Sequence, residues 1–180
     1  YGYSKQMFDE WALRHGALDR IAGLKYFNVY GPHEDHKGDM RSVVHKAYRQ
    51  ILETGAVQLF KSYKPQYRDG EQLRDFVSVR DAVAVTLFFY DHPDVSGLYN
   101  CGTGKARTWN DLANAVFEAM GKVHIFTTCL GSEMPESLRE KYQYYTQADM
   151  QKLRRTGYRE PFIELEQGVR DYVTGYLASG

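Results

Sequence analysis

The apolar residues near the start of the chain follow the spacing of one helix face. They are Met7, Phe8, Trp11 and Ala12, and Gly16 follows them. This spacing predicts a helix over residues 4–16 that ends at the glycine. The next segment, residues 21–30, is rich in apolar and aromatic side chains and predicts a strand, which Gly31-Pro32 ends.

The rest of the chain alternates between the same two patterns. Helices are predicted over about 41–53, 83–90, 108–120, 149–155 and 162–178, and short strands over 57–60, 74–79, 97–101 and 123–127. Residues 33–39 and 61–73 are polar and predict loops. Thr108, with Asp111 three residues later, predicts the N-cap of its helix. Strands that alternate with helices indicate an α/β fold, but the pattern does not give the order of the strands.

The composition narrows the class of protein. The 180 residues, 43% hydrophobic and 26% charged, are those of an ordinary soluble globular chain that can bury a core. The formal net charge is zero, which argues against nucleic acid or an anionic membrane as the main partner. No apolar run reaches the ~20 residues that span a bilayer. Only Cys101 and Cys129 are present, without disulfide or metal-ligand spacing, so we expect a reduced, cytoplasmic setting.

The first residues indicate that the sequence belongs to a longer protein. The chain has no initiator Met, and its first helix begins at once. We therefore expect the 180 residues to be the C-terminal portion of a larger chain, with any glycine-rich phosphate loop upstream. This portion alone is expected to be inactive and poorly stable, because strands that should neighbour residues 21–29 are missing.

Tyr1 and Lys5 are the first candidates for chemistry. On a helix, residues four apart share one face, so the ammonium of Lys5 would lie close to the phenol of Tyr1. A phenol with its ordinary pKa near ~10 exchanges protons poorly at neutral pH, and a nearby cation lowers that pKa. The pair is then a usable acid/base. Taken alone, the spacing has about even odds of being an ordinary helix surface.

Three further motifs follow in order. They are Tyr26-Phe27-Asn28-Val29-Tyr30-Gly31-Pro32, Arg74-Asp75-Phe76-Val77-Ser78-Val79 and Tyr99-Asn100-Cys101-Gly102-Thr103-Gly104. With the Tyr1–Lys5 pair, they resemble the extended short-chain dehydrogenase/reductase superfamily, whose members carry motifs of the form RYFNVYGP, RDFVYV and NxGTG. The resemblance covers nearly the whole chain. It implies the C-terminal part of an extended Rossmann fold together with a smaller mixed α/β substrate domain.

A narrower resemblance comes from two other segments. His36-Lys37-Gly38-Asp39-Met40 and Tyr142-Gln143-Tyr144-Tyr145-Thr146-Gln147-Ala148-Asp149 are similar to segments of the ADP-L-glycero-D-manno-heptose 6-epimerase family. This resemblance implies interconversion of ADP-D-glycero- and ADP-L-glycero-D-manno-heptose for lipopolysaccharide core synthesis. It also implies NADP as the cofactor, with NAD as the alternative, and a homo-oligomer. Another NAD(P)-dependent nucleotide-sugar epimerase, a 4,6-dehydratase and a non-catalytic dinucleotide sensor remain the alternatives.

The resemblance implies a division of the chain into two domains. Residues 1–36 would end the NAD(P)-binding Rossmann domain. Residues 37–180 would form mainly the sugar-nucleotide domain, with residues of about 73–92 returning to the Rossmann domain.

The resemblance also assigns the chemistry. Tyr1 would be the acid/base, and Lys5 would hold the nicotinamide ribose. Val29 would contact the nicotinamide through its backbone. Lys37 would be a second acid/base that also touches the cofactor. A ketone reduced from both faces needs its oxygen served in two orientations, and a desolvated lysine can do this. The plain alternative for Lys37 is a charge in a polar loop.

The residues implied in substrate binding are spread along the chain from residue 28 to residue 142. They are Asn28, Asp39, Lys46, Phe60, Lys61, Ser62, Tyr63, Arg74 and Tyr142. Arg74 is expected to bind the diphosphate, because a guanidinium presents a fork of donors, or else to pair with Asp75. For Asn28 and Val29 the alternative is packing at the strand end, and for Lys46 it is a solvated helical position.

Two other patterns are interpreted without a ligand. Residues 33–36 (HEDH) could suggest a metal site, but four adjacent loop residues rarely converge on one ion, so no metal is expected. Gly102-Thr103-Gly104 has no GK(S/T) after it and is interpreted as a tight turn, not as a phosphate loop.

Overall fold

The computed structural model describes residues 2–122, 136–139 and 141–179, which form a mixed α/β fold. The helices are α1 (Gly2–Arg14), α2 (Val43–Thr54), α3 (Val79–Asp91), α4 (Trp109–Ala119), α5 (Glu136–Arg139), α6 (Gln151–Arg155) and α7 (Leu165–Tyr172). Shorter turns are the 3-10 segments η1 (Ala17–Asp19) and η2 (Asp35–Met40) and the π-helical η3 (Val173–Leu177). The strands are β1 (Ala22–Tyr26), β2 (Asn28–Tyr30), β3 (Leu73–Ser78), β4 (Gly97–Cys101) and β5 (Ala106–Thr108).

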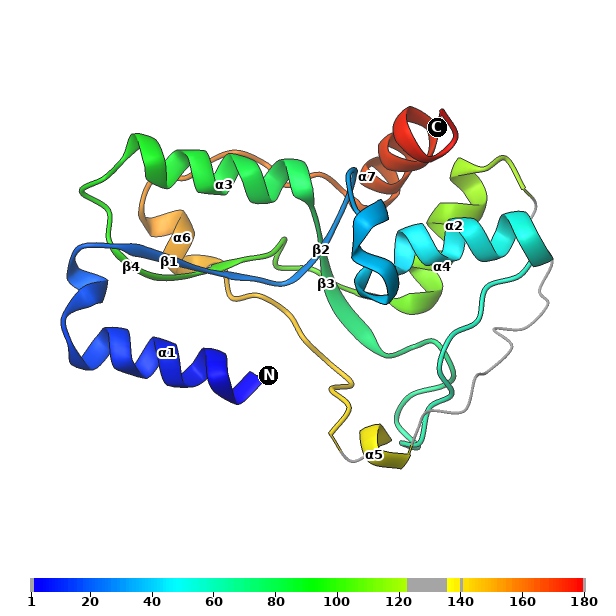
Figure 1. The fold of residues 1–180 in the computed structure, drawn as a ribbon, viewed down its shortest axis with the longest axis horizontal. Coiled ribbons are helices and arrows are strands. Elements are labelled where there is room, and N and C mark those ends of the chain that lie inside the picture. Colours follow the sequence, from blue (N-terminus) through cyan, green and yellow to red (C-terminus); the bar gives the residue numbers. More distant parts are fainter. Residues whose placement is uncertain (1, 123–135, 140, 180) are drawn as a thin grey trace.

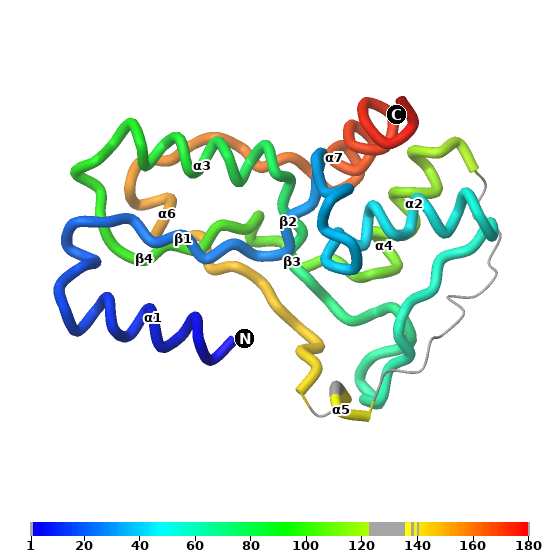
Figure 2. The backbone as a smooth tube through the Cα atoms, viewed as in Figure 1, coloured from blue at the N-terminus to red at the C-terminus, as the bar shows by residue number. Residues whose placement is uncertain are grey.

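The strand predicted over residues 21–30 divides at Phe27 and serves two sheets. β1 pairs in parallel with β4, with Lys25 opposite Asn100, and β2 pairs in parallel with β3. The Phe27 amide donates to the Cys101 carbonyl, 3.0 Å, at the point where the chain changes partners. Figure 2 follows the backbone through this crossing. β5 adds an antiparallel edge to β3. Because the apolar run is continuous, the sequence did not reveal the division.

Two hydrophobic clusters lie on either side of this crossing. One contains buried residues of α3 and β4 together with Leu153 and Tyr158. The other contains buried residues of α2, α4 and α7 together with Tyr30 and Phe76. In Figure 1, α1 and α3 lie on opposite sides of the β1–β4 pair, while α2, α4 and α7 lie together at the other end. The predicted domain boundary at residue 36 remains a prediction, and β4 and α6 pack with β1 and α3.

Local side-chain caps explain where three helices begin. Ser42 caps α2, and its hydroxyl accepts from the His45 amide at 3.4 Å. Ser78 caps α3, so this helix starts at Val79, four residues before the predicted start. Thr108 and Asp111 form a complete capping box on α4, which confirms that prediction.

Several predicted boundaries were wrong. Residues 57–60 do not form a strand, because this segment is bound by side chains: Gln58 donates its amide to Gln50, and Phe60 accepts from Gln72. Residues 35–40 form a 3-10 segment where a loop was predicted. The last predicted helix starts at Leu165 and changes to π geometry at Val173. The predicted strand 123–127 lies outside the described residues.

The Gly102-Thr103-Gly104 segment is a turn around a buried carboxylate. Asp75 is 0% exposed and accepts from the Thr103 amide and hydroxyl, both at 2.7 Å. Its other oxygen accepts from the amides of Gly104 at 2.9 Å and Ala148 at 3.0 Å. A Cβ on Gly102 would lie 2.8 Å from this carboxylate, which explains the glycine. The turn prediction is confirmed, and Asp75 binds these donors and not Arg74.

Replacing Asp75 with Asn is expected to lower the free energy of unfolding by about 2–4 kcal/mol. The amide cannot accept at both of its ends, so at least one buried N–H loses its acceptor, and the charge-assisted bonds weaken. Urea denaturation of the protein measures the change. Asp94→Asn, at an exposed position, is the matched control and should leave the stability nearly unchanged. Equal stabilities for the two variants would contradict this account.

Within the described ranges, no helix is both long and apolar enough to cross a membrane. The same part of the chain contains no group of three or more His, Cys, Asp or Glu side chains arranged to hold a metal ion. Cys101 is a buried free thiol, and burial raises its pKa to about 12, so it is an unreactive core residue. Cys129 lies outside the described residues.

Candidate functional site

A cleft of about 790 Å³ opens at the carboxyl ends of the parallel strands β1 and β4. This is the edge at which α/β proteins bind their ligands. The predicted site residues that line it are Lys5, Asn28, Val29 and Lys37. They come from α1, β2 and η2, so the fold brings together residues that lie more than thirty positions apart.

The wall of the cleft is rich in cations. Lys5, Lys25, Lys37 and Arg41 line it, while Glu34 contributes a buried carboxylate. Lys25 forms an ion pair with Asp9 of α1, and Glu34 is held by hydrogen-bond donors of the protein. The remaining positive charge favours an anionic ligand, such as a dinucleotide or a sugar nucleotide.

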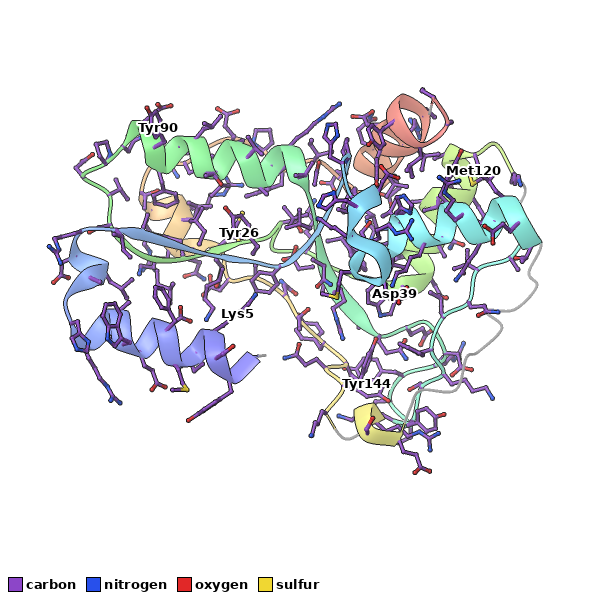
Figure 3. All side chains as sticks on the ribbon, viewed as in Figure 1. Lys5, Tyr26, Asp39, Tyr90, Met120 and Tyr144 are labelled. Carbon is purple, nitrogen blue, oxygen red and sulfur yellow. The ribbon has the colours of Figure 1, made fainter. Side chains whose placement is uncertain are left out.

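The position of Lys5 depends on how α1 is joined to the sheet. Only Ala12 of this helix is buried, and the Lys25–Asp9 ion pair connects β1 to the helix one turn after Lys5. Figure 3 shows Lys5 on the side of α1 that faces β1. Tyr1 lies outside the described residues, so its predicted pairing with Lys5 stays a prediction.

Lys37 lies in η2 and lines the same cleft as Lys5 of α1. Its side chain is exposed and makes no hydrogen bond or ion pair with residues in the described ranges.

Arg74 belongs to an aromatic cluster behind the cleft. Its guanidinium is stacked over the ring of Tyr142 at 5.0 Å and over that of Trp109 at 5.8 Å. It donates to the carbonyls of Leu73, 2.7 Å, and Gln143. Burial lowers the pKa of this guanidinium below its ordinary value. Arg74 thus holds the Tyr142 segment against the sheet, and its predicted contact with the diphosphate remains a proposal.

Other predicted substrate residues lie outside the lining of the cleft. Phe60 meets the ring of Tyr142 edge-on, with centroids 6.3 Å apart. The Lys46 ammonium donates to the Asp39 carbonyl at 2.5 Å, so these two residues bind each other near the start of α2. Figure 3 shows Asp39 beside α2.

The segment Lys61–Tyr63 also lies outside the lining. The Ser62 amide donates to Asp69 at 2.7 Å, and the Tyr63 amide donates to the Tyr144 hydroxyl at 2.9 Å. These contacts place the segment beside the aromatic cluster, and its predicted role in substrate binding stays untested.

The sequence analysis missed two residues that shape the cleft. Trp109 lines it and donates its indole N–H to the Tyr142 hydroxyl at 3.1 Å, so the aromatic cluster adjoins the cleft at this point. Glu34 also lines the cleft, although it is only 3% exposed. Glu34 was considered only as a metal ligand within residues 33–36. No sequence pattern marked Trp109 as a site residue, because its position directly after the Thr108 cap predicts only the start of a helix.

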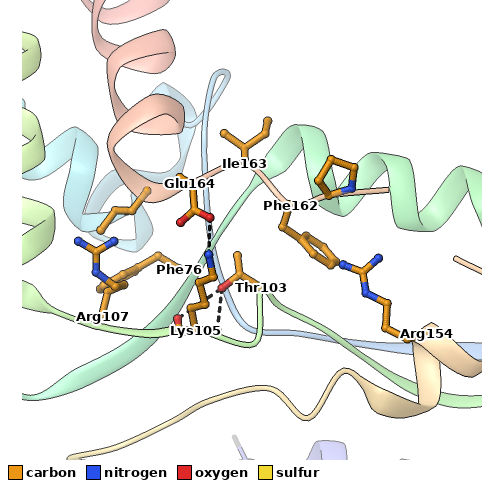
Figure 4. Close-up of a pocket in the computed structure, with 10 residues that line it drawn as sticks. Phe76, Thr103, Lys105, Arg107, Arg154, Phe162, Ile163 and Glu164 are labelled. Carbon is orange, nitrogen blue, oxygen red and sulfur yellow. Dashed lines mark hydrogen bonds and ion pairs between the residues drawn. The ribbon is translucent and has the colours of Figure 1, made fainter. Parts of the chain in front are cut away.

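A second cavity, of about 230 Å³, lies between the β4–β5 connection and the segment before α7 (Figure 4). Of the three cations that line it among the described residues, two form ion pairs with carboxylates, and the third, Arg154, donates to the carbonyls of Tyr158 and Glu160. Lys105 pairs with Glu164, and Arg107 pairs with Glu166 and Asp111. This cavity therefore offers an anion much less than the main cleft does.

Residues 1–102 match the family described as the NAD dependent epimerase/dehydratase family. Together with the parallel strands and the cleft at their carboxyl ends, this match shows that the chain belongs to that family. The predicted α/β fold class of the extended Rossmann type is confirmed, because the solved structures that match this chain are epimerases and dehydratases with the same fold.

Two curated relatives show which enzymes of this family the chain is similar to. The ADP-L-glycero-D-manno-heptose-6-epimerase of Nitratidesulfovibrio vulgaris is 56% identical over 179 residues, which are 99% of this chain and 54% of that protein. The enzyme of the same name from Fusobacterium nucleatum is 48% identical over 185 residues, covering 99% of this chain and 55% of its own. The predicted resemblance to this narrower family is thereby confirmed. The chain spans about half the length of the curated relatives it matches.

Two solved structures of epimerases also match this chain. The ADP-L-glycero-D-manno-heptose-6-epimerase of Helicobacter pylori matches with a TM-score of 0.77 and 30% identity, over 99% of this chain and 51% of that one. The UDP-glucose 4-epimerase of Thermus thermophilus, in complex with NAD, matches with a TM-score of 0.71 and 26% identity, over 98% and 52%.

Proposed function

We propose that this chain supplies the acid/base groups and much of the sugar-nucleotide site of an ADP-L-glycero-D-manno-heptose 6-epimerase. The observation that carries the proposal is the meeting of Lys5, Asn28, Val29 and Lys37 around one cationic cleft. The 56% identity to a relative of that name supports it. Because the relatives are about twice as long, the activity is proposed for the chain joined to the remaining half, called the intact protein below.

A nicotinamide dinucleotide fits the cleft as the cofactor of this proposal. The cleft is large, positively charged and placed at the carboxyl ends of parallel strands. Lys5 would hold the nicotinamide ribose, and the Val29 backbone would face the nicotinamide. The bound nicotinamide would accept a hydride from the sugar and return it. NADP is the proposed form, and competition between NADP and NAD in a binding titration tests the choice.

Two residues, Tyr1 and Lys37, would carry out the proton chemistry. Tyr1 would take the proton of the 6-hydroxyl as its carbon loses hydride, which leaves a ketone. After the ketone turns over, the hydride returns to the opposite face, and Lys37 would give the proton to the oxygen in its new orientation. No net oxidation results. Lys37 suits this role because it lines the cleft from η2, an element separate from the α1 helix that carries Lys5.

The remaining assignments concern the nucleotide. Asn28 would bind the sugar, Arg74 would contact the diphosphate, Phe60 would contact the nucleotide, and Tyr142 would be a further substrate contact. Asp39 and Lys46, and the segment Lys61–Tyr63, are proposed as outer contacts. A homo-oligomer and a cytoplasmic setting belong to the same proposal. The homo-oligomer follows from the resemblance, and sedimentation of the intact protein tests it. The cytoplasmic setting follows from the presence of only two cysteines.

The decisive experiment incubates the intact protein with ADP-D-glycero-D-manno-heptose and follows both epimers by NMR. We expect conversion to a mixture of the two epimers with no net change in the nicotinamide absorbance. In D2O the hydrogen on the epimerised carbon should be retained, because the same hydride returns. A dehydrated 4-keto-6-deoxy product would favour the dehydratase alternative, and binding without conversion would favour the sensor.

A further inference from the structure

The segment from His33 to Ser42, called the lysine loop below because it carries Lys37, contains the short 3-10 segment η2, which Gly38 interrupts with a non-helical conformation. Its backbone includes two left-handed residues, His33 with a φ of 67° and Gly38 with a φ of 53°. The Lys37 amide closes one internal turn by donating to the Glu34 carbonyl at 2.9 Å. The Lys37 side chain has no partner in the described ranges. Its place at the cleft therefore depends on how the whole loop is attached.

Glu34 attaches the two ends of the lysine loop to each other. One carboxylate oxygen accepts from the Ser42 amide at 2.6 Å, and the other accepts from the Ser42 hydroxyl at 2.5 Å. Ser42 is also the N-cap of α2, so the carboxylate ties the start of the loop to the start of a core helix. Lys37 lies between the two joined residues.

The C-terminal segment provides the second attachment. The Tyr172 hydroxyl donates to Glu34 at 3.0 Å, and the Tyr176 hydroxyl donates to Asp35 at 2.9 Å. His45 lies 3.1 Å from the other oxygen of Asp35. Two adjacent carboxylates thus bind two tyrosines from a segment about 140 positions away in the sequence. Two attachment points fix the orientation of a loop, whereas one would allow it to rotate.

The protonation states of Tyr172 and Asp35 are those that these hydrogen bonds require. Burial, followed by the effect of the Glu34 carboxylate, raises the pKa of Tyr172 above its ordinary value of 10.0, so its phenol remains a donor at neutral pH. The hydrogen bond with His45 lowers the pKa of Asp35 below its ordinary value of 3.8, so this group remains an acceptor. A buried carboxylate is costly unless it is fully hydrogen-bonded, and Glu34 has three donors.

We propose that Glu34, held by Ser42 and Tyr172, is a positioning residue that keeps Lys37 directed into the cleft. The inference rests on the proposed function, in which Lys37 is the second acid/base. Glu34 acts through the loop and transfers no proton itself, because its oxygens are occupied by three protein donors. The role requires the shape of the side chain and its hydrogen bonds more than its negative charge.

Three variants of the intact protein separate these roles. Glu34→Ala removes the attachment and should lower kcat roughly 10- to 100-fold with KM nearly unchanged, since a displacement of about 1 Å can cost ~10²-fold. Glu34→Gln should keep most of the activity, because its amide can accept from the Ser42 N–H and donate to both hydroxyls. Tyr172→Phe keeps the ring and removes one bond, so a loss on the order of threefold to tenfold is expected.

Tyr99→Phe is the matched control. Tyr99 is buried and donates its hydroxyl to the Ser96 carbonyl at 2.8 Å, away from the cleft. The Tyr99→Phe variant loses one hydrogen bond of a buried tyrosine, as Tyr172→Phe does, but this bond does not involve the lysine loop. A loss through Lys37 should also slow one epimer more than the other, as is expected of Lys37→Met, whereas a general structural loss should slow both equally. In the Lys37→Met background, Glu34→Ala should cost nothing further.

Hydrogen exchange adds a readout that does not depend on turnover. In Glu34→Ala, exchange over residues 35–41 should accelerate, and in Glu34→Gln it should not. Equal kcat losses for Glu34→Gln and Glu34→Ala, equal slowing of both epimers, or unchanged exchange would each overturn the positioning role. If the wild-type protein converts neither epimer, the proposed function fails, and the exchange result still decides whether Glu34 holds the loop.

Discussion

Tyr1→Phe in the intact protein is expected to lower kcat by about 10²- to 10⁴-fold while the affinity for ADP-heptose stays nearly unchanged. The phenol proton is used only in the transition state, and the ring of Phe packs in the same way. The expectation rests on Lys5, which lines the cleft from α1 and stands four positions after Tyr1. Steady-state kinetics with each epimer, and a binding titration, measure the two effects separately.

Tyr3→Phe is the matched control for this experiment. Tyr3 lies on the same helix, is 76% exposed and is absent from the lining of the cleft. Its variant should retain the wild-type rate. A loss of less than about tenfold in Tyr1→Phe would remove Tyr1 from the acid/base role, because general acids and bases typically contribute far more.

Lys37→Met is expected to slow epimerisation strongly, again by about 10²-fold or more, with little change in affinity. A ketone reduced from both faces needs a proton donor on each side, and Lys37 is the lysine that reaches the cleft from η2. If Tyr1 and Lys37 each serve one orientation of the oxygen, the two variants should differ in the epimer they still oxidise. Single-turnover oxidation of each epimer, followed by the nicotinamide absorbance, measures this difference.

Lys105→Met is the control for a lost lysine charge. Lys105 pairs with Glu164 outside the cleft, so its variant should keep both half-reactions. If Lys37→Met raises only KM, and equally for both epimers, Lys37 is a binding charge and the mechanism with two bases is wrong.

Features that depend on near neighbours in the chain could be predicted from the sequence. The helix that starts at Trp109 follows from the Thr108–Asp111 capping box, and α1 follows from its apolar spacing. Such signals arise from residues three or four positions apart, so the sequence contains them directly. The motifs that carry Lys5 and Lys37 also predict the family from the sequence alone.

Only the tertiary structure decided how these pieces assemble. The division of the 21–30 strand at Phe27 depends on β3 and β4, which come about fifty and seventy residues later. The role of Glu34 depends on Tyr172, which lies 138 positions away. Long-range pairings are fixed by the packing of the whole core, and no local period records them. The sequence by itself therefore determined the chemical groups, and the fold determined that Lys5 and Lys37 share one cleft.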